Sequence, residues 1–138
     1  MHEWALADAV VTAIRGTLGD KEPSSLRSVR ILIGELQAVD REIFSFGLST
    51  LLVPFGIAPQ AIVLETEKAE LACRACGRRW SLAEDSAVTE DQREAIHFLP
   101  EAAHAFIRCP GCGSADFSVE KGRGVSIAAI ELAEPGEP

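Results

Sequence analysis

Two stretches of apolar residues spaced three or four positions apart lie near the start of the chain. The first runs from Ala5 to Leu18 and is followed by Gly19, a residue type that commonly ends a helix. The second begins after Asp40, a favourable N-cap residue, and is limited by Pro54. The pattern therefore predicts two amphipathic helices. We expect the core face of the second helix to contain Ile43, Phe44, Leu48, Leu51 and Leu52.

Three apolar runs of the kind found in strands lie outside these helices. Residues 29–33 alternate toward Gly34-Glu35-Leu36, residues 61–64 continue into a more polar stretch, and residues 125–132 follow the turn-like Gly122-Arg123-Gly124. Because a two-stranded sheet is marginal in water, we expect the C-terminal strand to return and join the other two. The predicted fold class is α+β, with two helices on a three-stranded sheet.

The segment between the second and third strands is expected to form a second domain, inserted into the first. We place the first domain at residues 1–69 and 120–138, and the inserted domain at residues 70–119. Although 47% of the 138 residues are hydrophobic, 20 residues are alanine, which buries little surface. Two small cores can share this material only if something besides apolar burial stabilises one of them.

Two copies of Cys-x-x-Cys-Gly, at residues 73–77 and 109–113, carry a strong chemical pattern. Two intervening residues let both sulfurs of a pair reach one metal, and the glycine permits a tight turn beside them. Four thiolates leave no open position for a substrate, which is typical of a structural zinc site, although tetrahedral sulfur also suits iron. The candidate zinc ligands are Cys73, Cys76, Cys109 and Cys112.

The spacing of these pairs indicates an extended zinc ribbon. Residues 77–108 separate them, a longer interval than the roughly 15 to 20 residues of ordinary zinc motifs. We therefore expect an inserted segment at about 83–105, and short ribbon strands near 78–82 and 117–119. Four arginines close to the cysteines are expected to offset the negative charge of a zinc–thiolate centre: Arg74, Arg78, Arg79 and Arg108.

The charge and hydropathy of the chain exclude several partners. The net charge of −8 argues against a general nucleic-acid-binding protein. No apolar run approaches the roughly 18 to 20 residues of a membrane span, and acidic residues interrupt the N-terminal apolar stretch, unlike a signal peptide. We expect a cytoplasmic protein without a membrane or nucleic-acid partner.

A histidine at the second position gives the N-terminus a distinct metal chemistry. The amino group of Met1, together with the amide nitrogen and imidazole of His2, can supply three nitrogens in one plane. A planar nitrogen set favours Ni(II) or Cu(II) over zinc. His97, flanked by apolar residues, offers a fourth nitrogen, whereas we expect a structural role for His104. The alternative for the N-terminus is an ordinary solvated end.

Catalytic motifs are incomplete in this sequence. The stretch His2-Glu3-Trp4-Ala5-Leu6 begins like a zinc-protease helix but has leucine where the second histidine is required. The stretch Gly124-Val125-Ser126-Ile127-Ala128 lacks the final glycine of a nucleophile elbow. We therefore predict that the protein is not an enzyme.

Taken in order, Met1-His2-Glu3, Gly34-Glu35-Leu36 and the two cysteine turns resemble the HypA/HybF family of hydrogenase-maturation nickel metallochaperones. The resemblance covers the whole chain. It implies a nickel-binding α/β domain beside a zinc-ribbon domain, with Zn(2+) as a structural metal and Ni(2+) as cargo. It also implies two partners, the nucleotide-hydrolysing chaperone HypB and the large subunit of [NiFe]-hydrogenase; homodimer formation stays open.

The resemblance also assigns nickel ligands. Met1 and His2 correspond to the nickel-binding N-terminus, and Glu3 is expected to support the site. The long spacer is similar to that of archaeal-type members, in which a histidine of the insertion can approach nickel; His97 matches it, conditional on conformation. The competing hypothesis is a zinc-ribbon interaction or transcription-associated module without a nickel function.

Overall fold

The computed structural model describes residues 2–37, 39–82 and 89–134. Contacts divide the chain into two compact units, each built from segments that are distant in sequence. The first unit comprises Met1–Leu32, Val39–Glu65 and Ser126–Pro138, and the second comprises Ile33–Ala38 and Thr66–Val125. The expected domain boundaries at 69/70 and 119/120 differ from these by a few residues. The short segment 33–38 belongs to the second unit, which the sequence did not indicate.

Two long helices form one layer of the first unit. Helix α1 spans Glu3–Leu18 and ends at Gly19, whose φ of 58° suits a residue without a Cβ. Helix α2 spans Arg41–Leu52, and the Asp40 side chain caps it by accepting a hydrogen bond from the Ile43 N–H at 3.1 Å. Both predicted helices are therefore confirmed. They pack through Gly47, where an added Cβ would lie 3.3 Å from the Ala7 Cβ.

The expected core face of α2 is partly wrong. Phe44, Leu48 and Leu52 are buried as predicted. Ile43 is instead 44% exposed, because it lies in the first turn at the edge of the stripe formed by Phe44, Leu48 and Leu52, about 100° around the helix from Phe44. Leu51 is only half-buried.

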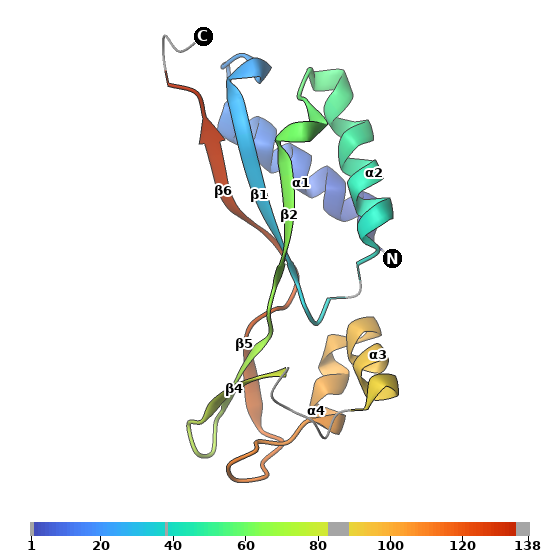
Figure 1. Cartoon of the computed structure of the whole chain (residues 1–138), viewed down its shortest axis with the longest axis vertical. Coiled ribbons are helices and arrows are strands. Elements are labelled where there is room, and N and C mark those ends of the chain that lie inside the picture. Colours follow the sequence, from blue (N-terminus) through green and yellow to red (C-terminus); the bar gives the residue numbers. More distant parts are fainter. Residues whose placement is uncertain (1, 38, 83–88, 135–138) are drawn as a thin grey trace. The chain divides into compact units, whose positions relative to one another are not determined.

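A three-stranded sheet forms the second layer of this unit, with the strand order β2-β1-β6. The strands are β1 (Leu26–Gly34), β2 (Ile62–Glu67) and β6 (Val125–Leu132). Figure 1 shows that β1 and β2 run parallel to each other, with α2 in the connection between them. Strand β6 runs in the opposite direction. The C-terminal strand thus joins the first sheet, as predicted, and the fold class is α+β.

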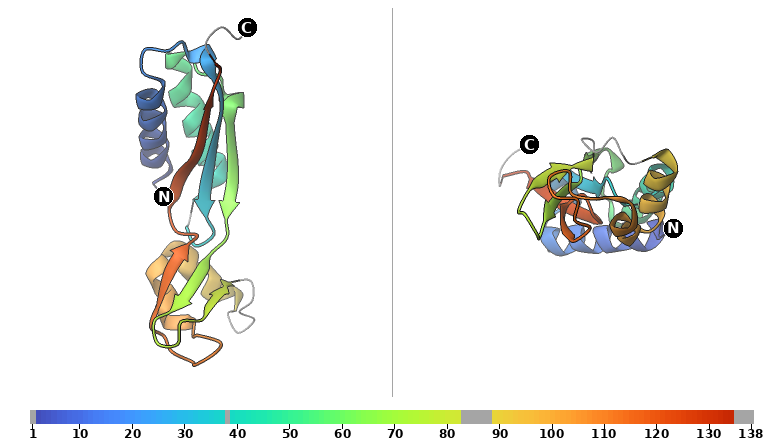
Figure 2. Two further views of the ribbon diagram at one scale, coloured as in Figure 1. Left: turned by 90° about the vertical axis from the view of Figure 1, so that its left-hand side faces the viewer. Right: turned by 90° about the horizontal axis from the view of Figure 1, so that it is seen from below.

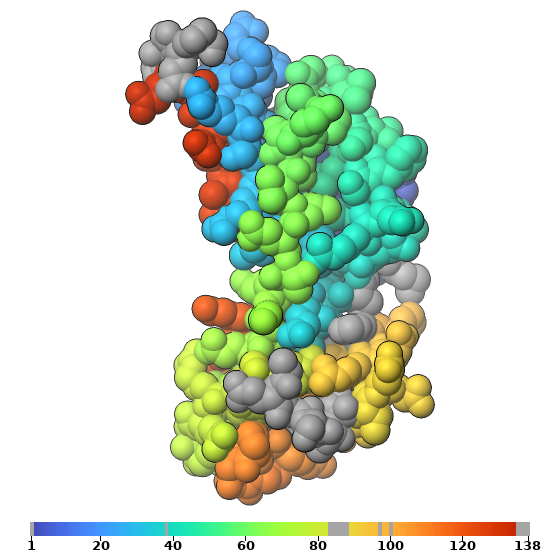
Figure 3. Space-filling model, viewed as in Figure 1, coloured from blue at the N-terminus to red at the C-terminus, as the bar shows by residue number. Residues whose placement is uncertain are grey.

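One face of this sheet is covered by both helices (Figure 2). Val29, Ile31 and Ile33 alternate along β1 and are buried. Short 3-10 helices link the elements: η1 (Pro23–Ser25) enters β1, η2 (Val53–Phe55) follows α2, and η3 (Pro59–Ala61) enters β2. In Figure 3 the side chains of α2 and β2 lie next to each other at the surface. A groove of about 450 Å³ lies there, lined by Arg41, Glu42, Ser45, Phe46, Ser49 and Leu64.

The second unit has an antiparallel sheet with the strand order β4-β3-β5. Its strands are β3 (Glu70–Cys73), β4 (Arg79–Ser81) and β5 (Phe117–Lys121). The strands β4 and β5 agree with the predicted ribbon strands. The inserted segment contains α3 (Glu90–Phe98), η5 (Pro100–Ala102) and α4 (Ala103–Phe106). The first part of the insertion, 83–88, lies outside the described residues.

The core of the second unit is small and includes two of the cysteines. Ile96 and Ala103 of the insertion pack into it, so the inserted segment completes the ribbon core. Leu36, from the short segment that follows β1, is also fully buried there. Among the described residues, no helix is long and apolar enough to cross a membrane.

Candidate metal centre

Four cysteine sulfurs converge at one end of the second unit. The Sγ atoms of Cys73, Cys76, Cys109 and Cys112 all lie within 4.8 Å of one another. Two sulfur pairs, Cys73 with Cys112 and Cys76 with Cys109, are each 3.5 Å apart. A tetrahedral zinc site with Zn–S distances of about 2.3 Å places its sulfurs about 3.8 Å apart. The sulfur geometry therefore fits a tetrahedral metal ion.

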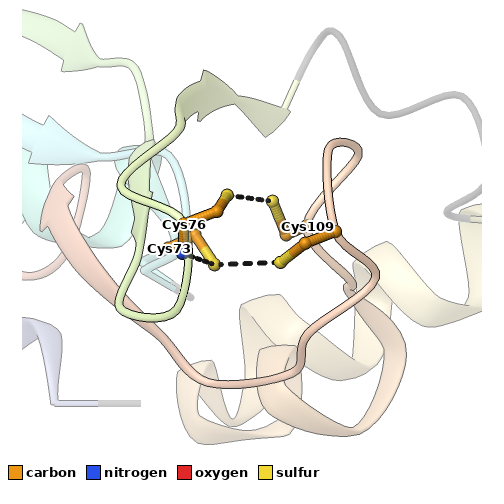
Figure 4. Close-up of side chains that lie close together, drawn as sticks. Cys73, Cys76 and Cys109 are labelled. Carbon is orange, nitrogen blue, oxygen red and sulfur yellow. Dashed lines mark hydrogen bonds between the residues drawn. The ribbon is translucent and has the colours of Figure 1, made fainter.

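The two cysteine turns have matching backbone geometry. In the first, the Cys76 N–H donates to the Cys73 Sγ at 3.4 Å and the Gly77 N–H donates to the Cys73 carbonyl at 3.0 Å. In the second, the Gly111 N–H donates to the Cys109 Sγ at 3.3 Å. Glycine ends each turn with a φ near +80°, a conformation that a side chain would strain. Figure 4 shows the labelled side chains of Cys73, Cys76 and Cys109 pointing toward one another.

These turns also prepare two sulfurs for metal binding. The Cys76 N–H holds the pKa of Cys73 below its usual range. Burial raises the pKa of Cys109, but the N–H groups of Cys112 and Gly111 outweigh it and lower that pKa to about 6. Because a metal binds the thiolate and not the thiol, the lowered pKa values favour the metal-binding form of these two sulfurs.

Three of the four nearby arginines have partners other than the cysteine sulfurs, and their expected role in offsetting the charge of the thiolates stays a prediction. Arg74 pairs with Asp116 at 2.9 Å, and the Arg79 Nε donates to a Glu70 carboxylate oxygen at 2.7 Å. Arg108 donates to backbone carbonyl oxygens. These guanidinium groups already have partners of their own. Proximity in sequence could not reveal this, because the competing carboxylates approach only in the folded chain.

Aromatic side chains pack in the core beside Cys73 of the first cysteine turn. Phe117 is fully buried and pairs with Cys73 across the sheet. The Trp80 ring meets the Phe117 ring edge-on, with centroids 5.6 Å apart, and the His104 ring stacks on it at 4.3 Å. The His104 Nδ1 also lies 3.3 Å from the Ala115 carbonyl oxygen. These contacts give His104 a packing role.

The candidate nickel residues are described only in part. His2 is exposed at the N-cap of α1, and its carbonyl accepts a hydrogen bond from the Leu6 N–H at 2.8 Å. Met1 lies outside the described residues, and so does the side chain of His97, whose backbone belongs to α3. The grouping of Met1, His2 and His97 around nickel therefore stays a prediction.

Glu3 connects the start of α1 to the start of α2. It is only 7% exposed, and its Oε1 accepts a hydrogen bond from the Asp40 N–H at 3.2 Å. The terminal amino group and the N–H groups of Glu3 and Asp40 lower the pKa of Glu3 to about 2. Sequence spacing gave no indication that Asp40, predicted only as a helix cap, lies beside Glu3. The buried carboxylate stays ionised and holds these two helix starts together.

Comparisons with known proteins cover nearly the whole chain. The family described as "Hydrogenase/urease nickel incorporation, metallochaperone, hypA" matches residues 1–132. The hydrogenase maturation factor HypA of Pyrococcus horikoshii is 44% identical over 138 residues, which cover 99% of this chain and 99% of the relative. The chain belongs to the HypA family. The resemblance recognised in its motifs is thereby confirmed.

Other HypA proteins agree in length and fold. HypA of Pyrococcus abyssi is 45% identical over 139 residues, covering 99% of this chain and all of the relative. The solution structure of the nickel metallochaperone HypA from Helicobacter pylori has a TM-score of 0.60 and 18% identity, over 96% of this chain and 98% of that chain. At this identity the likeness concerns the fold alone. The two-unit α+β architecture is therefore that of solved HypA structures.

Proposed function

We propose that this HypA-family chain is a nickel metallochaperone that binds Ni(II) at its free N-terminus and delivers it during [NiFe]-hydrogenase maturation. Three nitrogens would hold the ion: the Met1 amino group, the His2 amide and the His2 imidazole. His97 would supply a further nitrogen, and Glu3 would support the site. The cargo is transferred without covalent chemistry, so the protein would act as a carrier and not as an enzyme.

The exposed position of His2 at the N-cap of α1 is the observation that carries the nickel site. The first N–H groups of a helix have no partner within the helix, so the helix leaves the His2 amide nitrogen available to a metal. The next residue, Glu3, is held in place because its side chain accepts a hydrogen bond from the Asp40 N–H. An exposed three-nitrogen site suits a cargo that must be released, because its ligands are reachable by protons and by a competing acceptor.

Zinc is the ion that we assign to the four cysteines. The donor set consists entirely of sulfur and leaves no open position, which suits a permanent structural ion. Cys73, Cys76, Cys109 and Cys112 would therefore hold Zn(2+) while nickel comes and goes at the other unit. Bound zinc contributes charge neutralisation and cross-linking of the two turns.

The proposed partners follow from family membership. We infer that nickel passes between this chain, a nucleotide-hydrolysing chaperone of the HypB type, and the large subunit of [NiFe]-hydrogenase, in the cytoplasm. The relatives named as hydrogenase maturation factors support a maturation role, and the four-cysteine unit alone would have fitted an interaction module equally well. Family membership favours the metallochaperone over that alternative.

Nickel titration of the zinc-loaded protein tests the proposal. Protein with a native N-terminus should bind Ni(II) with the absorption of a planar nitrogen site, and an N-terminal tag or His2→Ala should abolish both. His104→Gln is the matched control, because this histidine stacks on Phe117 and should leave nickel binding unchanged. If the tagged protein keeps the same affinity and absorption, the N-terminal site is wrong.

The contribution of His97 is tested separately. His97→Ala should weaken nickel binding, either in the protein alone or in the presence of the partner nucleotide hydrolase. An affinity that is unchanged in both conditions would remove His97 from the site while leaving Met1 and His2 in place.

A further inference from the structure

Segment 34–37, which carries the Gly-Glu-Leu motif, is hydrogen-bonded on both sides within the second unit. On one side, the N–H groups of Gly34 and Leu36 donate to the carbonyls of Gly124 and Gly122, each at 2.8 Å. On the other side, the N–H group of residue 35 donates to the carbonyl of residue 67 at 2.8 Å. The segment therefore lies between two other parts of the chain that are distant in sequence.

Three polar side chains strengthen this junction, and we call them the polar clamp. Their oxygens accept hydrogen bonds from backbone N–H groups of neighbouring segments: Ala69 N–H to Glu35 Oε1 at 2.8 Å, Gly122 N–H to Glu67 Oε1 at 2.8 Å, and Gly124 N–H to Gln37 Oε1 at 3.0 Å. All three side chains are half-buried. Hydrogen bonds to carboxylates in such surroundings are stronger than those between neutral groups.

The backbones at the clamp approach so closely that two positions require glycine. A Cβ on Gly34 would lie 2.3 Å from the Gly122 carbonyl oxygen. A Cβ on Gly122 would lie 2.4 Å from the Ala69 Cα, and its φ of +92° would strain any side chain. The clamp therefore has one well-defined arrangement.

The clamp is connected to the cysteine centre by two short strands and a shared core. Strand β3 follows Ala69 directly and ends at Cys73, so four residues, about 13 Å of extended chain, separate the clamp from a metal ligand. Strand β5 pairs alongside, with Phe117 opposite Cys73 and Lys121 opposite Glu70. Leu36 packs in the same core as Cys73 and Cys109.

We propose that the polar clamp is energetically coupled to the four-cysteine centre, with Glu35, Gln37 and Glu67 acting as positioning residues for metal binding. Metal binding fixes the ends of β3 and β5 at the cysteine turns, and the clamp fixes their other ends. By linkage, a metal that tightens the clamp is itself held more tightly by an intact clamp. The inference rests on the zinc-binding half of the proposed function and does not involve nickel.

Coupling differs from a purely local contact in a measurable way. A clamp that acted only on its own segments would leave the rate of zinc release and the geometry of the cysteine turns unchanged when it is weakened in a folded protein. Weakening a coupled clamp changes both the release rate and the turn geometry, because it loosens β3 and β5 up to their ends at the cysteine turns. The Cys76 and Gly111 amides, which donate to sulfur, report on those ends.

Zinc release from the full chain to a chromogenic chelator is the first test. Glu35→Ala removes the acceptor for the Ala69 N–H and should speed release about tenfold. Glu35→Gln keeps an oxygen at this place and should stay within about twofold of the wild type. Glu70→Ala is the matched control, because Glu70 lies closer to Cys73 yet pairs with Arg79 at the exposed surface, and it should also stay within about twofold.

Amide hydrogen exchange of the zinc-loaded variants is the second test. Glu35→Ala should speed exchange at Ala69 and also at Cys76 and Gly111, whereas Glu70→Ala should leave the latter two unchanged. If Glu35→Ala does not fold, Gln37→Ala takes its place, with Gly124 instead of Ala69 as the local reporter, the same response at Cys76 and Gly111, and a smaller increase in release. The proposal is overturned if the clamp variant releases zinc no faster than Glu70→Ala, or if only Ala69 responds. The nickel titration is independent of either result.

Discussion

The two units of this chain are stabilised in different ways. The first buries large apolar side chains such as Ile14, Ile31, Phe44 and Leu48 between two long helices and a sheet. The second has strands of three to five residues and a core that includes two metal-ligating cysteines. A core of this size is marginal without additional cross-links. Apolar burial can therefore maintain the first unit, whereas we expect the second to depend on a bound metal.

Metal removal should have the largest effect and should separate the two units. A strong chelator, or Cys73→Ser, is expected to unfold the second unit because zinc binding supplies its folding energy. Amide protection at Leu71 and Phe117 should fall on the order of a hundredfold or more, while Ile14 and Val29 of the first unit stay protected. Hydrogen exchange followed by NMR measures both in one experiment.

Ser118→Ala provides the control for the cysteine substitution. Ser118 lies on β5 beside the same core, and its hydroxyl donates only to the exposed Glu120 at 3.0 Å. This variant should keep its zinc and its protection in both units. Loss of protection at Ile14 upon chelation would mean that the first unit is not independently stable, and the contrast between the units would fail.

Core truncation should show which unit each buried residue stabilises. Phe44→Ala is expected to cost about 3–5 kcal/mol in the first unit, and Leu36→Ala about 2–5 kcal/mol in the second. The two tryptophans make natural reporters, because Trp4 belongs to the first unit and Trp80 to the second. Urea unfolding of single-tryptophan versions should show Phe44→Ala shifting the Trp4 transition and Leu36→Ala shifting the Trp80 transition.

The Leu36 variant is the sharper of these two tests. Leu36 follows β1 by only two residues, so its sequence position suggests the first unit. Its complete burial in the core of the second unit gives the opposite expectation. A shift of the Trp4 transition alone would contradict the assignment of segment 33–38.

The sequence supported the elements well and the long-range contacts poorly. Helix periodicity, the Asp40 cap, the apolar strand run at 125–132 and the cysteine turns are local patterns, and the structure confirms each of them. Their physical causes act within a few residues. Local patterns are enough for the fold class and for the four-cysteine centre.

The missed features all depend on groups that are distant in sequence. Arg74 was expected to offset the charge of the thiolates, and its ion pair with Asp116, 42 residues away, was not foreseen. The polar clamp joins Gln37 to Gly124, 87 residues apart, and no periodicity marks either residue. Ile43 was placed on the core face of α2 because spacing alone could not fix the rotation of that helix. Tertiary packing decides such contacts, so the sequence pattern had no means of predicting them.

Removing the helix cap of α2 should have a moderate effect confined to the first unit. Asp40→Ala loses the hydrogen bond from the Ile43 N–H and should cost about 1 kcal/mol, measured by the Trp4 transition in urea. Asp40→Asn keeps an acceptor oxygen and should restore most of this stability. The Asp40 N–H that donates to Glu3 is retained in both variants, so the anchoring of Glu3 should persist. A shift in the Trp80 transition would argue against independent units.

Loss of a surface ion pair should have the smallest effect on stability. One such pair lies in each unit, so the two units can be compared directly. Arg30 pairs with Glu65 in the first unit, and Arg74 pairs with Asp116 next to the cysteine centre. Both arginine side chains are more than half exposed, so Arg30→Ala and Arg74→Ala should each cost about 0.5 kcal/mol or less. Salt should reduce both effects further. Because Asp116 already neutralises the charge of Arg74, Arg74→Ala should change the rate of zinc release by less than about twofold. A clearly larger increase for Arg74→Ala, with none for Arg30→Ala, would instead support the expectation that the arginines offset the charge of the thiolates.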